Sequence, residues 1–104
     1  MTATWFSQWF ARRKPVIGVV HLGPLPGSPR YGGDFEAVLE RAELDVDAYV
    51  KGGADAVLVE NFGDAPFFAT QVPAITVAAM TRAATLVVRG ARGRPVGVNV
   101  LRND

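Results

Sequence analysis

Three short apolar runs, rich in valine, mark the chain at regular intervals. They span Pro15–Val20, Ala56–Val59 and Pro95–Val100. Each run is almost continuously apolar rather than alternating, which is typical of strands buried on both faces of a parallel sheet. The runs recur about every 40 residues, which leaves room for a strand, a loop, a helix and a return turn in each unit. The pattern therefore predicts three parallel strands.

The stretch between the first two runs has the period of an amphipathic helix. Apolar residues recur at steps of three and four over residues 35–50, and charged residues fill the opposite side. Asp34 is placed to cap the amino end, and Gly52 and Gly53 are helix-ending signals. We expect a helix over residues 35–51.

A second helix is predicted between the second and third runs. Pro73 suits a first helical turn, and Gly90 and Gly93 end the segment. The predicted apolar face, which should pack on the sheet, consists of Val77, Met80, Ala84, Val87 and Val88.

The order strand, helix, strand, helix, strand decides the fold class. Right-handed crossovers place both helices on the same side of neighbouring parallel strands, which is how a (β/α) barrel of the TIM type begins. An open doubly wound sheet begins in the same way and is the alternative. Its dinucleotide-binding version is disfavoured, because the first strand leads into a proline-rich loop and not into G-x-G-x-x-G. We predict an α/β fold with a parallel barrel architecture over residues 15–104.

Residues 1–14 form a separate amino-terminal segment. Its aromatic residues fall on one side of a short helix, and these are Trp5, Phe6, Trp9 and Phe10. A basic cluster at residues 12–14 follows. We favour a helix that covers the bottom of the barrel, since the segment immediately precedes the first strand. An apolar face next to cations is also typical of a helix at a membrane interface, so peripheral membrane association is the alternative.

Composition and charge narrow the classes of function. The chain has 104 residues, of which 49% are hydrophobic and 20% charged, as in an ordinary globular protein. A net charge of +1 is far from the basic excess of nucleic-acid-binding proteins, so we expect no nucleic-acid partner. The sequence contains no cysteine, which excludes disulfides, thiolate zinc sites and thiol nucleophiles. It has no apolar run of roughly 20 residues and no signal-peptide pattern, so a cytoplasmic location is expected.

Polar residues gather where the predicted strands end, and ligands of parallel α/β folds bind beyond these ends. His21 follows the first strand and Glu60 the second. An imidazole suits proton transfer, and a carboxylate after four apolar residues is costly to bury unpaired, so we predict these two as the catalytic residues. A histidine held by a carboxylate or a backbone carbonyl, and a glutamate with a structural partner, are the alternatives.

A second set of polar residues at the same ends is predicted to bind the ligand. Amide and carboxylate oxygens make up this set, together with one guanidinium that can hold an anion through two parallel hydrogen bonds. The set comprises Asn61, Asp64, Asn99, Arg102, Asn103 and Asp104. Turn and capping roles also explain Asp64 and Asn103. Carboxylates and a histidine can hold a divalent metal, but their spacing here defines no ligand set, so we assign no metal and no cofactor.

Three long motifs carry a resemblance to a known family. KPVIGVVHLGPLPGSPRYGG (residues 14–33), GGADAVLVENFGDAPFF (52–68) and PVGVNVLRND (95–104) closely resemble the opening of BtpA/SgcQ family proteins. The resemblance implies a TIM barrel of the ribulose-phosphate-binding type. It also implies a connection to photosystem I biogenesis at the cytoplasmic face of the thylakoid in photosynthetic members, and to sugar-related or secondary-metabolic genes in others. All the catalytic and ligand-binding candidates stand at motif positions and are carried over as candidate pocket residues.

The length departs from the pattern of this family. A complete barrel needs about 250 residues, whereas this chain ends directly after its third predicted strand. We therefore expect a truncated barrel with an incomplete, inactive site, and self-association through exposed sheet edges.

Two functions from different classes follow as hypotheses. The first is an enzyme acting on a small ligand such as a sugar phosphate, with Glu60 and His21 in proton transfer and Arg102 holding the anionic group. The second is a non-catalytic assembly or stability factor for a membrane complex such as photosystem I, in which the barrel serves as a binding platform.

Overall fold

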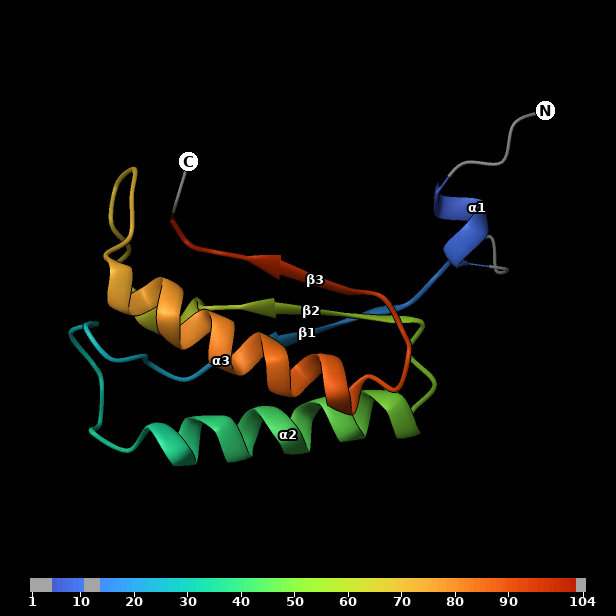
Figure 1. The fold of residues 1–104 in the computed structure, drawn as a ribbon, viewed down its shortest axis with the longest axis horizontal. Coiled ribbons are helices and arrows are strands. Elements are labelled where there is room, and N and C mark those ends of the chain that lie inside the picture. The colour runs from blue at the N-terminus through green and yellow to red at the C-terminus, as the bar shows by residue number, and fades with distance from the viewer. Residues whose placement is uncertain (1–4, 11–13, 103–104) are drawn as a thin grey trace.

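The computed structural model describes residues 5–10 and 14–102. Strands and helices alternate along the chain, after one short amino-terminal helix (Figure 1). The elements are α1 (Trp5–Trp9), β1 (Ile17–His21), α2 (Phe35–Lys51), β2 (Ala56–Glu60), the 3-10 helix η1 (Phe62–Asp64), α3 (Ala74–Gly90) and β3 (Val96–Asn99).

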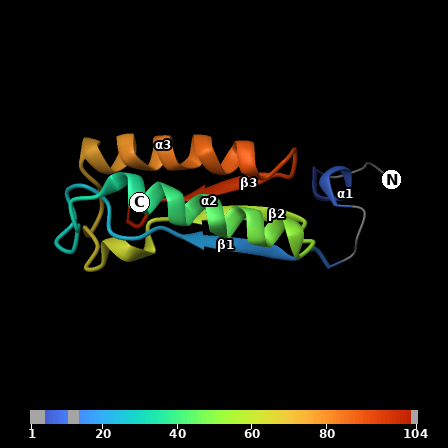
Figure 2. The same ribbon diagram turned by 90° about the horizontal axis from the view of Figure 1, so that it is seen from below.

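The three strands form one parallel sheet in the order β1-β2-β3. Their last residues lie level with one another, His21 opposite Glu60 and Glu60 opposite Asn99. The helices α2 and α3 lie side by side on one face of this sheet (Figures 1 and 2). The parallel α/β arrangement predicted from the valine-rich runs is confirmed.

The predicted strand boundaries were wrong by one or two residues. The strands β1 and β3 begin after the prolines at positions 15 and 95, since a proline has no N–H for the ladder. At the other end, β1 and β2 extend to His21 and Glu60, and the N–H of Leu22 donates to the carbonyl oxygen of Glu60 at 2.9 Å. Both predicted catalytic residues are therefore the last residues of strands and not the first residues of loops.

The ends of α2 agree with the signals in the sequence. The side chain of Asp34 accepts a hydrogen bond from the N–H of Ala37 at 3.0 Å, as an N-cap does. At the carboxyl end the N–H of Gly52 donates to the carbonyl oxygen of Ala48 at 2.9 Å. Gly53 follows with a φ of +88°, a backbone conformation that favours glycine.

The predicted start and packing face of α3 need correction. Pro73 is the N-cap residue and the helix begins at Ala74. Val77 and Val88 were expected on the packing face, but they are 48% and 55% exposed. The buried face consists of Thr76, Ala79, Met80, Ala83 and Val87. Because α3 is apolar on nearly every side, its periodicity alone does not select the face that packs.

The helix α1 lies at the end of the sheet where the strands begin (Figure 1). Its aromatic side chains and residues of all three strands line a cavity of about 230 Å³. Lys14 is exposed, and Arg12 and Arg13 of the predicted basic cluster lie outside the described residues.

Candidate functional site

The sheet has a core face and an open face. Val20, Val57 and Val59 are almost completely buried and pack in one cluster with residues of α2 and α3. Successive side chains of a strand point to opposite faces. His21 and Glu60, each next to a buried valine, therefore lie on the face that α2 and α3 leave open.

The open face is apolar where the strands begin and polar where they end. The apolar part, which lines the cavity beside α1, contains Ile17, Ala56, Leu58 and Gly97. The polar part contains His21, Glu60 and Asn99. An apolar floor below a polar rim at the carboxyl ends of parallel strands is the layout of a ligand site in α/β barrels.

The three polar side chains form a row across the sheet, in which Glu60 contacts a neighbour on each side. Nε2 of His21 lies 3.3 Å from Oε1 of Glu60. On the other side, Nδ2 of Asn99 donates to Oε2 of Glu60 at 2.7 Å. The His21 side chain is 54% exposed and the Glu60 side chain only 16%. Glu60 is thus fixed from both sides, while the imidazole is accessible.

Phe62 is a site residue that the sequence analysis missed. Its ring stacks on the imidazole of His21, with the ring centres 4.7 Å apart and the planes 23° apart. Phe67 extends this aromatic wall, with its ring centre 6.4 Å from that of Phe62. An aromatic residue two positions after a strand end was the available signal, but its contact with His21 depends on the turn of η1.

Asn61 joins the ends of β2 and β3. Its side chain is completely buried. Oδ1 accepts a hydrogen bond from the N–H of Leu101 at 2.5 Å, and Nδ2 donates to the carbonyl oxygen of Leu101 at 2.6 Å. The side-chain amide of Asn61 therefore pairs with the backbone of Leu101 just beyond the end of the sheet, where backbone groups of a strand would otherwise pair.

Asp64 connects the loop after β1 to Asn61. Oδ1 accepts from the N–H of Leu25 at 2.7 Å, and Oδ2 accepts from Nδ2 of Asn61 at 3.1 Å. Gly63 precedes Asp64 and packs closely against the backbone that follows β1. A Cβ added to Gly63 would lie 2.6 Å from the carbonyl oxygen of Leu22. In the structure Asn61 and Asp64 hold the three strand ends together, and their binding of a ligand stays a prediction.

The remaining predicted residues are at or beyond the end of the described chain. Arg102 is exposed and follows β3 at the same edge of the sheet. Asn103 and Asp104 lie outside the described residues. Within residues 5–10 and 14–102, no group of three or more histidine, aspartate or glutamate side chains is arranged to hold a metal ion. In the same part of the chain, no helix is long and apolar enough to cross a membrane.

The fold and the row of polar side chains define a parallel α/β protein with a candidate ligand site at the carboxyl ends of its strands. More specifically, the chain belongs to the BtpA family, whose sequence profile matches residues 12–104. No solved structure matches the chain.

Relatives occur in all three domains of life. The chain is 53% identical over 96 residues to an uncharacterized protein of Pyrococcus furiosus, covering 88% of this chain and 34% of that protein. It is 52% identical over 101 residues to the photosystem I biogenesis protein BtpA of Synechocystis sp., covering 93% of this chain and 33% of that protein. An uncharacterized mitochondrial protein of Caenorhabditis elegans is 32% identical over 77 residues, covering 74% of this chain and 28% of that protein. The chain spans about a third of the length of these relatives.

Proposed function

We propose that the chain supplies the first three strands of a TIM-type (β/α) barrel that binds a small polar ligand, such as a sugar phosphate, at the carboxyl ends of its strands. The observation that carries this proposal is the row of His21, Glu60 and Asn99 on the open face of the sheet. In a barrel this face is the interior, and its carboxyl end is the mouth of the pocket.

In this proposal His21 exchanges a proton with the ligand, and Glu60 positions the imidazole of His21. The carboxyl oxygen of Glu60 beside Nε2 can accept a proton held on Nε2, and this tautomer leaves Nδ1 to accept a proton from the ligand. The stacked ring of Phe62 restricts rotation of the imidazole out of this orientation. A histidine oriented by a carboxylate is a recurrent acid-base arrangement in enzymes.

In this proposal the groups around His21 and Glu60 bind the rest of the ligand. Asn99 borders Glu60 on the neighbouring strand, and Arg102 supplies a guanidinium suited to a phosphate or carboxylate. Asn103 and Asp104 follow directly and remain in the proposed ligand-binding set. Asn61 and Asp64 contribute by fixing the loops that carry these residues.

The proposal is tested on a chimera in which residues 12–104 replace the matched third of the Pyrococcus furiosus relative. Its melting temperature is measured with a panel of sugar phosphates, and we expect at least one to raise it. A ligand at a hundredfold excess over its Kd stabilises the folded state by about 2.7 kcal/mol. His21→Ala and Glu60→Gln should lose the rise, and Glu43→Gln on the exposed side of α2 should keep it. No shift with any compound, or a shift that survives both site substitutions, contradicts the proposal.

A second proposed function is that of a non-catalytic assembly factor for a membrane complex. It is favoured by the name of the Synechocystis relative and by Trp5 and Trp9, whose side chains are 62% and 59% exposed on α1. Flotation of the chimera with anionic vesicles tests it, and Trp5→Ala combined with Trp9→Ala should abolish flotation. A wild-type chimera that stays in the soluble fraction removes the membrane anchor from the proposal.

A further inference from the structure

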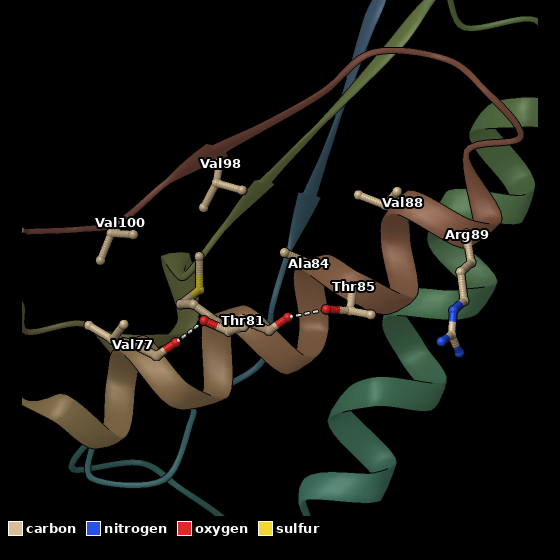
Figure 3. A pocket seen from close by; sticks show the side chains of 9 residues that line it. Val77, Thr81, Ala84, Thr85, Val88, Arg89, Val98 and Val100 are labelled. Atoms are coloured by element: carbon tan, nitrogen blue, oxygen red, sulfur yellow. Dashed lines mark hydrogen bonds between the residues drawn. The ribbon is translucent and has the colours of Figure 1, made fainter.

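The helix α3 borders two grooves that differ in chemistry. The α3 groove, on the side of β3, has a volume of about 500 Å³ and is bordered by valines of the helix and of the strand side (Figure 3). The interhelical groove, between α2 and α3, has a volume of about 750 Å³. Its lining comes from α2, α3 and Arg92, just beyond α3, and is largely charged.

The two walls of the interhelical groove carry opposite charges. The charged side chains on the α2 wall are acidic, and those on the α3 wall are basic. The acidic residues are Glu40, Glu43 and Asp47, and the basic residues are Arg82, Arg89 and Arg92. Steps of three and four residues place the acidic row along one side of α2. The helices touch at the floor of the groove, since a Cβ added to Gly90 would lie 2.6 Å from Val46, so the two rows are held side by side.

Most of these charges have no ion pair within the described chain. Asp47 pairs with Lys51 at 2.8 Å. Among the described residues, neither Glu40 nor Glu43 has a cationic partner, and none of the three arginines has a carboxylate partner. Like charges repel within each row, so a row of the opposite charge placed over them would stabilise both.

An exposed leucine lies within the acidic row. Leu44 follows Glu43 on α2 and is 63% exposed, and it lines the groove together with Leu86 of α3. Apolar side chains at the centre of a patch with charged groups around them are typical of protein interfaces. Burial of Leu44 against a partner would add an attraction that exposed ion pairs alone do not supply.

The charge pattern selects the kind of partner. A polyanion would be repelled by the acidic wall, and a polycation by the basic wall. A second copy of the chain carries both rows in the same arrangement. The helices α2 and α3 run in the same direction (Figure 1), so a two-fold axis along the groove places the acidic row of each copy over the basic row of the other. An axis across the groove would place like charges together.

From these observations we propose that the interhelical groove is the contact surface of a symmetric dimer of this chain. In this dimer Glu40 and Glu43 of each copy face Arg82 and Arg89 of the other, and every such contact occurs twice. Leu44 of both copies is buried between the helices. The contact differs from association through open sheet edges, which uses backbone hydrogen bonds and requires no opposite charges. It leaves the open face of the sheet, with the candidate ligand site, uncovered.

The test measures pairing of the 104-residue chain by energy transfer between a donor and an acceptor dye on its terminal amine. An arginine-reversed variant combines Arg82→Glu with Arg89→Glu, and a glutamate-reversed variant combines Glu40→Lys with Glu43→Lys. Each should pair with itself about tenfold more weakly than the wild type does, because like charges then face each other twice. A mixture of the two variants should pair as tightly as the wild type. An ionic strength of about 1 M, where the screening length is about 3 Å, should remove these differences.

A matched control separates the groove from net charge. Arg30→Glu combined with Arg41→Glu changes the net charge as the arginine-reversed variant does, at two exposed positions outside the groove lining. This control should pair with itself like the wild type. It should pair with the glutamate-reversed variant more weakly than the arginine-reversed variant does.

Cross-linking gives a second measurement that does not rely on charge. The chain has no cysteine, so two single variants, Glu43→Cys and Arg89→Cys, can be mixed and treated with a short thiol cross-linker. We expect the cross-linker to join them, because the dimer places α2 of one copy over α3 of the other. Glu36→Cys, on α2 but outside the groove lining, should not be joined to Arg89→Cys.

Three results overturn the proposal. The first is equal pairing by the wild type and both reversed variants, which would place self-association on other surfaces such as the sheet edges. The second is a mixture of the reversed variants that pairs no better than either variant alone. The third is equal cross-linking of Arg89→Cys by Glu36→Cys and Glu43→Cys. Where a reversed variant loses the helical circular dichroism of the wild type, the cross-linking result decides.

Discussion

At the scale of single residues, the site rests on two kinds of polar side chain. The imidazole of His21 is exposed to solvent. The side-chain amide of Asn61 is buried, and it both donates to and accepts from the backbone of Leu101. His21 ends a valine-rich strand and Asn61 follows one, so their positions in the sequence do not show which of the two has a structural role. Their burial shows it, because a buried amide must satisfy its donors and acceptors within the protein.

Asn61→Ala should therefore destabilise the fold, while Asn99→Ala should not. The first substitution removes both partners of the Leu101 backbone groups and one from Asp64, at a cost on the order of 1–3 kcal/mol. Asn99 is exposed, and its loss leaves Glu60 in contact with His21. The urea midpoint of the chimera measures both effects. Equal midpoints for the two variants contradict the role assigned to Asn61.

At the scale of elements, some features were readable from the sequence and others were not. The cap at Asp34 and the stop at Gly53 are local, so the bounds of α2 were predictable. The face of α3 was not, because Val77 and Val88 are as apolar as the residues that pack. Whether these two valines are buried depends on which elements pack beside α3, and the periodicity of α3 does not contain this information. The stacking of Phe62 on His21 depends likewise on a turn that no periodic pattern encodes.

The contact between α2 and β1 makes a prediction about Gly18. A Cβ added to Gly18 would lie 2.5 Å from the ring of Tyr49, whose hydroxyl donates to the carbonyl oxygen of Val19 at 2.7 Å. Gly18→Ala should push this helix from the strand and lower the free energy of unfolding by about 1–3 kcal/mol. Gly23→Ala is the matched control, since its Cβ would lie 3.8 Å from Val38. A urea midpoint for Gly18→Ala equal to that of the control would show that the contact is not tight.

At the scale of the whole molecule, the described sheet leaves large apolar side chains in water. Ile17 on the open face is 52% exposed, and Val98 beside the α3 groove is 50% exposed. Complete burial of such a side chain is worth about 1.5–3 kcal/mol, and each half-exposed one forfeits roughly half of that, so several of them together rival the 5–15 kcal/mol that holds a domain together. We propose that the isolated chain self-associates. Light scattering should find particles larger than the 11.1 kDa monomer, and a monodisperse monomer with a sharp calorimetric transition contradicts this.

The central claim is that the open face of this sheet is the interior of a (β/α) barrel with His21, Glu60 and Asn99 at its mouth. A crystal structure of the chimera tests it most directly. The claim predicts that the outer edges of β1 and β3 are both paired with further parallel strands, and that the three side chains face the enclosed pocket. A structure in which helices cover the open face, as in a doubly wound sheet, would contradict it.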